Sequence, residues 1–596
     1  MLVLAGAVFA SIAVRTQTSA PDGEQLFTAR CATCHSGDAA SRAPALDALR
    51  SRAPQAIIEA LVNGAMRVQG ATMNGAERRA VAEFVTGKKL EGDVIGAVAS
   101  SRCRTATPLG NSARSSHWSG WSPAITNTRF QPGDQAGLTA GDLSRLTMKW
   151  AFGFPDAASA WAQPTVAGGR VFVGSQNGTV YSLDAASGCI HWAFSAGGGV
   201  RTAITIGQRS GRAAAYFGDT AATAYALDAE TGEKIWTRKV DEHPLARITG
   251  SPALFEGRLY VPVSSYEESQ GADPNYGCCT FRGNLVALDA KTGSVLWKTY
   301  VVADKPAPRG KSSAGIQLWG PSGSSIWSAP TIDVKRRAVY VATGNTYSGP
   351  PQPSSDAVVA LDLKTGAIRW MRQVTPNDIY ITGCRADNPN CPSANGPDLD
   401  FGSPPILATR PDGRDVIVIG QKSGVGFALD PDKQGEILWQ YRAGDGGVLG
   451  GIEWGSAVDG ANVYFAVSDI TRPKPGGLHA VALATGKDVW IAAPPPAKCS
   501  GRGCNSAQSA ALTAIPGIVF SGSNDGTLRA YSANNGSVVW EFDSNREFAT
   551  TNGVPARGAS MIGPGPAIAG GMIFVNSGYG AFGGRTGNVL TAFGVN

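Results

Sequence analysis

The sequence predicts a mostly all-β fold, an eight-bladed β-propeller with a small all-α domain at its N-terminus. One motif of turns and strands recurs eight times after residue 117. Before residue 95, apolar residues recur three or four positions apart, which is typical of helices. The chain has 76 glycines in 596 residues and only 16% charged residues, a composition typical of turn-rich proteins with a large buried fraction. A chain of this length should form more than one domain.

Each repeat contains a Gly turn, a strand with alternating apolar residues, a Leu-Asp-Ala-like end, a Thr-Gly turn and a strand that ends in Trp. The copies, of which the last is partial, occupy residues 177–192, 223–236, 283–297, 357–370, 426–439, 479–490, 526–540 and 587–595. Such four-stranded units bury their faces only against their neighbours, as the blades of a propeller do. We expect the Asp and Gly of each copy to set a tight turn and the Trp to pack between blades. The last copy lacks the Trp, and we expect it to close the ring with the first blade.

The segments outside the propeller can also be assigned. Residues 1–20 contain an apolar run followed by small residues, which predicts an export signal cleaved near Ala20, although the usual positive start is missing. Residues 21–95 form the helical domain, residues 96–116 a linker, and residues 117–596 the propeller. No other run reaches the roughly 18 apolar residues of a membrane span, so we expect none in the mature chain. The net charge of +6 is spread without a Lys/Arg block, which argues against a nucleic-acid partner.

The ten cysteines indicate an oxidising compartment. Two belong to the motif described next, and three pairs among the other eight are close in sequence. We expect Cys384–Cys391 and Cys499–Cys504 to staple loops, which leaves Cys103 and Cys189 to pair with each other. The adjacent Cys278 and Cys279 either close a strained ring or bond to two distant partners. The protein is therefore expected in the periplasm or outside the cell.

The motif Cys31-Ala-Thr-Cys34-His35 is the attachment site of a c-type haem. Its spacing brings two thiols to the two vinyl groups of the haem and turns the imidazole of His35 towards the iron as the proximal ligand. It also lies near the start of the helical unit. We therefore interpret residues 21–95 as a cytochrome c domain.

A methionine on the other side of the iron would raise the reduction potential, which suits an electron acceptor. Two methionines, Met66 and Met73, compete for this role. Similarity to small class I cytochromes c favours Met66, because the family carries a Gly-x-Met ligand loop ahead of its last helix. Met73 falls just before that helix and remains the alternative.

Three further motifs carry a resemblance that covers nearly the whole mature chain. They are Thr128-Arg-Phe-Gln131, the segment Leu146-Thr-Met-Lys-Trp-Ala-Phe-Gly-Phe-Pro155, and Val200-Arg-Thr-Ala203. On these, the chain resembles the alcohol dehydrogenases that depend on pyrroloquinoline quinone (PQQ), and most closely the polyvinyl-alcohol dehydrogenases. The resemblance implies PQQ, haem c and calcium as cofactors. It does not follow from the fold, because propellers serve many functions.

The resemblance also implies roles for individual residues. It implies Glu267, Asn345 and Asp400 as calcium ligands, Thr249 and Ser264 as hydroxyls that hold the cofactor, Trp327 as the indole on which the quinone stacks, Lys422 as the contact to the quinone oxygens, Arg201 as the carboxylate-binding cation, and Cys278 and Cys279 as a ring beside the cofactor. Asp400, which precedes an aromatic residue, is implied as the catalytic base. Asp378 is the rival base, because an insertion interrupts this region.

These residue types suit the implied chemistry. Calcium prefers hard oxygen donors such as those of Glu267 and Asn345, although magnesium uses similar ligands. The three carboxylates of PQQ suit the cation of Arg201. Lys422 would stabilise negative charge on the quinone oxygens, and Asp400 could accept the proton of an alcohol.

The expected function is therefore oxidation of the secondary alcohol groups of polyvinyl alcohol to ketones, with electrons passing through PQQ and the fused haem to an external acceptor such as a soluble cytochrome c. One alternative is a PQQ-dependent dehydrogenase of small alcohols. Another is a non-catalytic propeller scaffold, which would leave the haem motif unexplained.

Overall fold

The computed structural model describes residues 21–37, 43–62, 65–66, 69–70, 73, 75–89, 101–105, 108–110, 116–385, 388–393 and 395–595. The predicted export signal lies outside these residues, as does part of the predicted linker. Among the described residues, no helix is both long and apolar enough to cross a membrane.

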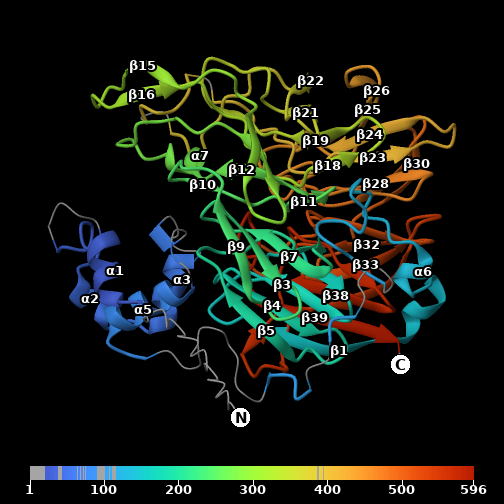
Figure 1. Ribbon diagram of the computed structural model, residues 1–596, viewed down its shortest axis with the longest axis horizontal. Coiled ribbons are helices and arrows are strands. Elements are labelled where there is room, and N and C mark those ends of the chain that lie inside the picture. Colours follow the sequence, from blue (N-terminus) through green and yellow to red (C-terminus); the bar gives the residue numbers. More distant parts are fainter. Residues whose placement is uncertain are drawn as a thin grey trace, which may run out of the picture.

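The described part of the N-terminal domain, shown in blue in Figure 1, contains the helices α1 (Gly23–Arg30), α2 (Leu46–Arg50), α3 (Pro54–Val62) and α5 (Gly75–Thr86). Asp22 caps α1, because its side chain accepts hydrogen bonds from the backbone amides of Glu24 and Gln25. Apolar residues at helical spacing meet in one core that includes Leu61 and Val85. The predicted helical domain is therefore present in the structure.

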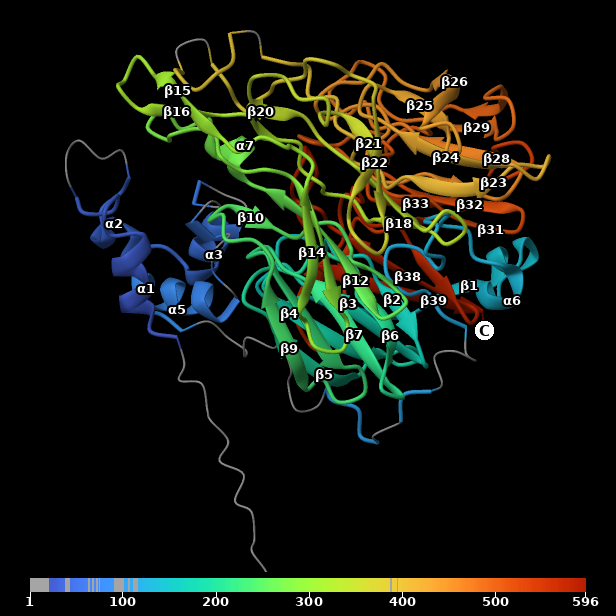
Figure 2. The ribbon, with the colours of Figure 1, turned by 45° about the horizontal axis from the view of Figure 1, so that its top comes forward.

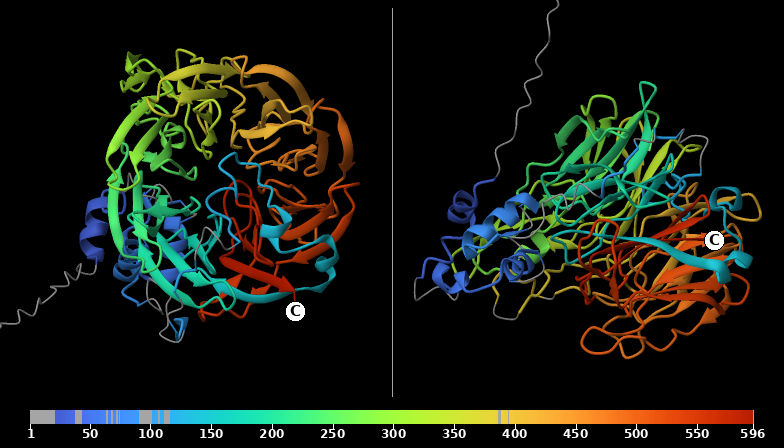
Figure 3. Two further views of the ribbon diagram at one scale, coloured as in Figure 1. Left: turned by 45° about the vertical axis from the view of Figure 1, so that its right-hand side comes forward. Right: turned by 90° about the horizontal axis from the view of Figure 1, so that it is seen from below.

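Eight antiparallel sheets follow, each built on four strands, and they are arranged around a central axis as the blades of a propeller (Figure 3, left). In chain order, the first sheet contains β2 (Thr165–Ala167), β3 (Arg170–Gly174), β4 (Thr179–Asp184) and β5 (Ile190–Ser195), and the second contains β6 (Thr205–Arg209), β7 (Arg212–Gly218), β8 (Thr223–Asp228) and β9 (Lys234–Lys239). The third contains β11 (Ala253–Phe255), β12 (Arg258–Ser265), β13 (Asn284–Asp289) and β14 (Val295–Tyr300), with β10 (Ala246–Arg247) added on β12, and the fourth contains β18 (Thr331–Asp333), β19 (Ala338–Ala342), β21 (Ala357–Asp362) and β22 (Ile368–Gln373). The fifth contains β23 (Ile406–Thr409), β24 (Asp415–Gly420), β25 (Val425–Asp430) and β26 (Glu436–Arg442), the sixth β27 (Ala457–Val458), β28 (Asn462–Ala466), β29 (Leu478–Ala482) and β30 (Asp488–Ala492), and the seventh β31 (Thr513–Ile515), β32 (Ile518–Gly522), β33 (Thr527–Ser532) and β34 (Val538–Asp543).

The eighth sheet joins the two ends of the propeller. Its order is β1–β39–β38–β37, with β1 (Leu146–Gly153), β37 (Ala567–Ala569), β38 (Met572–Ser577) and β39 (Val589–Val595). The antiparallel pairing of β1 with β39 confirms that the last repeat closes the ring (Figure 1).

Short elements decorate the loops. They are α6 (Gly133–Ala136), η2 (Ala140–Arg145), α7 (Glu267–Gln270), β15 (Ala307–Lys311), β16 (Gln317–Gly320), β17 (Ser322–Gly323), β20 (Thr346–Ser348), β35 (Glu547–Phe548) and β36 (Ala556–Arg557). The hairpin of β15 and β16 lies near α7 in two views (Figures 1 and 2). The β15–β16 hairpin and α7 together extend the loops at one end of the third sheet.

The repeated Trp joins each blade to the next, as predicted. Trp192 is 5% exposed, and its Nε1 donates a hydrogen bond to the carbonyl of Ala229 in the following blade over 3.0 Å. Gly232, in that blade's turn, has a φ of 76° and lies against the indole, where a Cβ would be 2.6 Å from Cδ2. Trp236 and Gly293 repeat this contact. Glycine is required here both for its left-handed backbone and for the close approach of the ring.

The four expected disulfides are present. Cys103 bonds to Cys189, and the other pairs are Cys278–Cys279, Cys384–Cys391 and Cys499–Cys504. The Cys103 bond attaches part of the predicted linker to the first blade, next to β5. Cys31 and Cys34 take part in none of these disulfides, as haem attachment requires. The helical domain projects from one side of the ring (Figure 3, right).

Candidate functional site

Cys31, Cys34 and His35 of the haem motif line a cavity of about 110 Å³ in the helical domain. Its wall consists of Phe27, Arg30, Cys31, Cys34, His35, Leu49, Ile57, Ala60, Leu61, Met66, Gln69, Val81 and Val85. Most of these side chains are apolar, and the wall includes the thiols of Cys31 and Cys34 and the imidazole of His35. The cavity therefore matches the chemistry of a covalently attached porphyrin.

The orientation of His35 suits an iron ligand. Its Nδ1 lies 2.7 Å from the carbonyl oxygen of Pro44, a contact that places the proton on Nδ1 and leaves Nε2 free to bind a metal. Met66 lines the cavity, whereas Met73 is fully buried in the helical core and is absent from the cavity wall. The geometry thus favours Met66 over Met73 as the second ligand.

The second set of predicted residues lies in loops at the ends of propeller strands. Arg201 lies between β5 and β6, Thr249 between β10 and β11, Trp327 between β17 and β18, Asn345 between β19 and β20, Asp400 before β23, and Lys422 between β24 and β25. Hydrogen bonds and ring contacts bring four of them into one buried group: Trp327, Asn345, Asp400 and Lys422. They come from two neighbouring blades, the fourth and the fifth, and the packing of these blades brings them together.

Asp400 lies at the centre of this group. Its Oδ1 accepts a hydrogen bond from the backbone amide of Asn345 over 2.7 Å, and its Oδ2 accepts one from Trp327 Nε1 over 3.1 Å. Lys422 Nζ lies 3.6 Å from the same Oδ2. Gly344 leaves room for this carboxylate, because a Cβ there would lie 2.7 Å from Asp400 Cγ. The carboxylate is thus held in one orientation between a cation and an indole.

Lys422 is shared by two carboxylates. Its Nζ lies 2.9 Å from Asp398 Oδ1, closer than Asp400. Burial alone would lower the pKa of Lys422, but the charges of Asp398, Asp400 and Glu268 outweigh it and hold that pKa well above its usual value. Burial raises the pKa of Asp398 well above its ordinary range despite the lysine. Lys422 therefore stays protonated in this site.

The structure does not bring the Glu267 carboxylate into this group. Its Oε1 accepts hydrogen bonds from the Tyr276 hydroxyl and the Thr280 amide, each over 2.8 Å, and its Oε2 accepts the Phe281 amide over 2.7 Å. His243 Nε2 lies 3.4 Å from Oε1. Both oxygens accept hydrogen bonds outside the central group, and the role of Glu267 as a metal ligand stays a prediction. Through these bonds Glu267 fixes the loop that follows α7.

The neighbouring Glu268 belongs to the central group. Burial raises the pKa of Glu268 to about 7, the charge of Asp400 adds to the rise, and Lys422 opposes it. The hydroxyl of Thr382 donates a hydrogen bond to Glu268 Oε1. This carboxylate was not expected from the sequence, although it is adjacent to the residue that was.

The Asn345 side chain presents an unused acceptor. Its Nδ2 donates hydrogen bonds to the carbonyls of Thr346 and Tyr380, both over 3.0 Å, which fixes the amide orientation. Its Oδ1 is buried and has no hydrogen-bond partner among the described residues. A buried acceptor without a donor is costly unless a metal ion or ligand completes it. This is the strongest structural indication of a cation in the site.

Trp327 connects this group to a small cavity of about 20 Å³. Arg201, Thr249, Trp327 and Trp454 are among the residues that line it. Gly402 packs on the edge of the Trp327 indole, and a Cβ there would lie 2.3 Å from Cη2. The indole therefore has a fixed plane beside an open space.

Two buried cations lie near this cavity. Arg201 stacks on the Trp454 ring, with its guanidinium 4.3 Å from the ring centroid. Burial, together with the positive charge of Arg201, lowers the pKa of Arg247 to about 10, and Arg247 Nε has no hydrogen-bond partner among the described residues. Within the described part of the chain, neither Arg201 nor Arg247 forms a salt bridge, in contrast to Lys422. The pair therefore suits an anionic ligand.

The remaining predicted residues lie close by. Thr249 Oγ1 and Ser264 Oγ are 2.9 Å apart, so the two expected hydroxyls meet. Cys278 and Cys279 are buried in an apolar cluster with Tyr347. The hydroxyl of Tyr347 lies 2.5 Å from Ser325 Oγ, two residues before Trp327. The bonded cysteine pair is thus placed next to the loop that carries the stacking indole.

Asp378, the rival base, has a supporting position. Its Oδ2 accepts the amide of Leu399 over 2.8 Å, and its Oδ1 accepts the amide of Asp398 over 3.3 Å. It is 1% exposed and therefore holds the segment that carries Asp400. This geometry favours Asp400 as the group that meets a substrate.

Three family models match the chain. A model described as outer membrane protein assembly factor BamB matches residues 142–313 and 474–594, and a model described as the β-propeller domain of glucose, ethanol and alcohol dehydrogenases matches residues 243–444. A model described as subunit III of cbb3-type cytochrome c oxidase matches residues 18–85. Both parts of the chain thus have counterparts in known families.

Two relatives match at nearly full length. The polyvinylalcohol dehydrogenase of Pseudomonas sp is 43% identical over 99% of this chain and 97% of the relative, and that of Sphingopyxis sp. (strain 113P3) is 39% identical over 96% and 93%. Among solved structures, the quinohemoprotein alcohol dehydrogenase of Comamonas testosteroni has a TM-score of 0.59 at 20% identity and covers 84% of this chain and 83% of its own. The enzyme ADHIIG of Pseudomonas putida HK5 has a TM-score of 0.61 at 16% identity, with 82% of each chain covered. These structures share the fold, the propeller with eight blades.

Proposed function

We propose a function for this chain on the premise that it belongs to the polyvinylalcohol dehydrogenase family of PQQ-dependent quinohaemoproteins, as its identity to two full-length members shows. The chain oxidises secondary alcohol groups of polyvinyl alcohol to ketones, with PQQ as the first acceptor and its own haem c as the second. The observation that carries the proposal is the buried Trp327–Asn345–Asp400–Lys422 group, with its unpartnered amide oxygen, in the same chain as the haem cavity.

The residues around Trp327 fit PQQ. When bound, PQQ supplies a quinone carbonyl that accepts a hydride from the substrate carbon. The indole of Trp327 offers a flat apolar face on which such a ring system stacks. Arg201 and Arg247 are buried cations that can bind its carboxylates. The hydroxyls of Thr249 and Ser264 can donate further hydrogen bonds.

The donor set also fits a calcium ion. The unpartnered Oδ1 of Asn345, the Asp400 carboxylate and the Glu268 carboxylate are hard oxygen donors, which calcium prefers. Glu268 replaces Glu267 in this proposal, because both oxygens of Glu267 are engaged elsewhere. Calcium takes about six to eight oxygens, so these residues leave coordination positions for other ligands. The described residues contain no group of three or more His, Cys, Asp and Glu side chains arranged around one metal position, so the amide oxygen is needed.

Asp400 acts as the base that accepts the proton of the substrate hydroxyl. Its carboxylate is fixed by Asn345 and Trp327 and lies beside the cation of Lys422. Lys422 stays protonated and stabilises negative charge that develops on a nearby oxygen. Asp378 orients the Asp400 segment through two backbone amides.

The electrons leave through the haem to an external acceptor such as a soluble cytochrome c. Cys31 and Cys34, which form no disulfide, and the position of His35 support covalent haem attachment. Four disulfides support function in an oxidising compartment, the periplasm or the cell exterior.

Turnover measurements test the substrate. The protein loaded with PQQ and calcium should show a higher kcat/KM on polyvinyl alcohol, counted per hydroxyl group, than on short secondary alcohols. Equal or better turnover of the short alcohols would show that the polymer is not the preferred substrate. Failure of every alcohol to support turnover would contradict the dehydrogenase itself.

A further inference from the structure

Arg78 bridges the cytochrome domain and the propeller. Arg78, in α5, is only 4% exposed, and its guanidinium donates hydrogen bonds to three backbone carbonyls. Nη1 donates to Gly70 over 3.2 Å and to Met73 over 3.0 Å, whereas Nη2 donates to Gln176 of the propeller over 2.7 Å. The planar guanidinium, with five donors in a fixed fork, is suited to such a bridge.

Two of these carbonyls belong to the segment that carries the proposed iron ligand. Met66 and Gln69 of this segment line the haem cavity. The carbonyl of Met66 accepts the amide of Gly70 over 2.9 Å, and the carbonyl of Gly70 accepts the amide of Met73 over 3.1 Å. Arg78 therefore binds carbonyl groups of the same backbone hydrogen-bond network that includes Met66.

The propeller side of the bridge is firmly held. Gln176 lies between β3 and β4, and its side-chain Oε1 accepts the amides of Ala158 and Ser159 over 2.9 and 3.0 Å. The next residue, Asn177, lies against Gly75 so closely that a Cβ on Gly75 would be 2.5 Å from its carbonyl oxygen. The carbonyl that Arg78 binds is thus part of the rigid ring and not of a loose loop.

Burying the charged side chain of Arg78 costs free energy that an apolar side chain at the same place would not cost. Burial lowers the pKa of Arg78 to about 10, so the side chain is still charged at neutral pH. A charge is expensive to bury, and an apolar side chain would fill the same space without that penalty. The directional bonds of Arg78 therefore suggest a role in orientation.

We propose that Arg78 is a positioning residue that transmits docking on the propeller to the Met66 segment and so keeps the methionine on the haem iron. Methionine ligation raises the reduction potential of a haem. Contact with the propeller then sets the potential of the acceptor that the propeller reduces. This inference rests on the proposed ligation by Met66 and is independent of the substrate.

The test uses the full-length protein with covalently bound haem. Arg78→Met keeps the apolar stem and removes all three hydrogen bonds. The oxidised variant should lose most of the weak red absorption band of a methionine–iron bond, and its midpoint potential should shift downward. Arg78→Lys, which keeps the charge but not the fork, should give an intermediate result.

Two controls separate this role from general damage. Haem bound per chain should equal that of the unchanged protein, which shows that the domain has folded. Arg79→Met removes the ion pairs of Arg79 with Glu83 and with Asp156 of the propeller, 3.1 and 3.8 Å long, and leaves the bonds of Arg78 in place. Arg79→Met should therefore keep the absorption band.

The possible results are distinct. A methionine band and potential unchanged in Arg78→Met would overturn the proposal, as would equal losses in Arg78→Met and Arg79→Met. Met66→Ala tests the premise: if it keeps the band, Met66 is not the ligand, and the ligand assignment falls together with the role of Arg78. If the band is lost in Met66→Ala but kept in Arg78→Met, only the role of Arg78 is wrong.

Discussion

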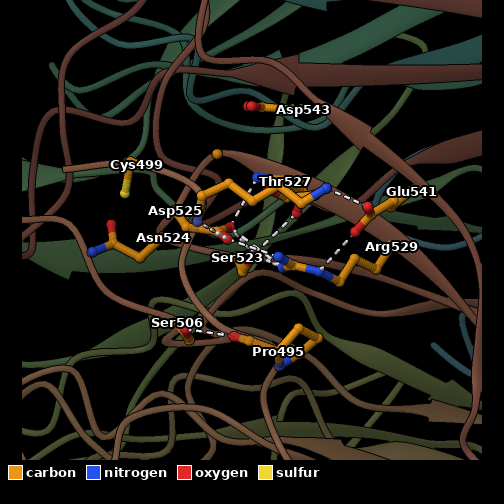
Figure 4. Close-up of polar contacts among 12 residues, drawn as sticks. Pro495, Cys499, Ser506, Ser523, Asn524, Asp525, Thr527, Arg529, Glu541 and Asp543 are labelled. Carbon is orange, nitrogen blue, oxygen red and sulfur yellow. Dashed lines mark hydrogen bonds and ion pairs between the residues drawn. The ribbon is translucent and has the colours of Figure 1, made fainter.

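Two buried groups of carboxylates and cations in the propeller serve different purposes. In the seventh sheet, Arg529 pairs with Asp525 over 2.7 Å, four residues away in the chain (Figure 4). Asp525 also accepts hydrogen bonds from the Ser523 hydroxyl and the Thr527 amide. The central group instead collects Glu268, Asp398, Asp400 and Lys422 from several blades. The Arg529 group forms within a single turn of one blade, whereas the central group forms only where neighbouring blades pack together.

The charges differ in the same way. Burial raises the pKa of Asp525, but the hydrogen bond and charge of Arg529 outweigh it and hold that pKa below its usual value. In the central group burial raises the pKa of Asp398 and Glu268, since three carboxylates share one lysine. A balanced pair stabilises the fold, whereas an excess of carboxylates beside an unpartnered amide oxygen is prepared for a cation.

The largest effect is expected for Asp400→Asn. General-base catalysis contributes about 10²–10⁴-fold, so haem reduction by alcohol should slow by that factor. The free energy of unfolding should fall by about 1–3 kcal/mol, because the new amide keeps an acceptor for only one of the two donors, the Asn345 amide and Trp327 Nε1. Stopped-flow absorbance of the haem measures the rate, and thermal unfolding measures the stability. If Asp378→Asn abolishes reduction while Asp400→Asn does not, the base is misassigned.

The structural pair should show the opposite behaviour. Asp525→Asn leaves Arg529 buried without its anion, and breaking such a pair costs about 3–5 kcal/mol. The urea midpoint should fall, while turnover per folded molecule stays the same. Glu541→Gln is the matched control, because Glu541 is 39% exposed and an exposed pair contributes about 0–1 kcal/mol. A catalytic loss in Asp525→Asn at unchanged stability would erase the distinction between the two groups.

The adjacent glutamates provide a sharper version of this comparison. Glu268→Gln should raise the calcium concentration for half-maximal activity by about 10-fold or more, since even partners outside the coordination sphere contribute this much. Glu267→Gln should instead lower stability by about 1–3 kcal/mol, because the new amide places a donor against buried donors. Calcium titration and urea unfolding of both variants measure the two effects. An exchange of the two results would restore Glu267 as the ligand.

A smaller effect is expected at the stacking indole. Gly402→Ala places a methyl group against Trp327, and overpacking of this kind costs about 1–3 kcal/mol. The indole must shift, so PQQ should bind more weakly in a fluorescence titration of the cofactor-free protein. Gly141→Ala, where the added Cβ would lie no closer than 3.7 Å to another residue, tests the general effect of replacing a glycine. Equal PQQ affinity in Gly402→Ala and the unchanged protein would argue against stacking on Trp327.

The propeller and the haem motif could be predicted because their signals are local. Each Trp contacts the turn of the next copy, so the motif that repeats in the sequence is also the contact that repeats in space. The residues of the haem motif, Cys31, Cys34 and His35, lie within one short segment. Neither feature requires knowledge of how distant loops meet.

The details of the central site could not be predicted in this way. Glu267 and Glu268 are adjacent in the short helix α7, and successive helical residues point about 100° apart, so a one-residue difference decides which carboxylate faces the site. Arg247 lies outside every motif that carries the resemblance. Asp398 is two residues from Asp400 and has a left-handed φ of 55°, which the sequence alone does not reveal. Only the packing of blades brings these groups together.

The most direct test of the account is a single-turnover experiment on the haem. Protein loaded with PQQ and calcium, with its haem oxidised, is mixed with polyvinyl alcohol in the absence of an external acceptor. The account predicts that the haem becomes reduced in the unchanged protein and stays oxidised on the same timescale in Asp400→Asn. A haem that stays oxidised in the unchanged protein, or that is reduced equally fast in both, would contradict the central claim.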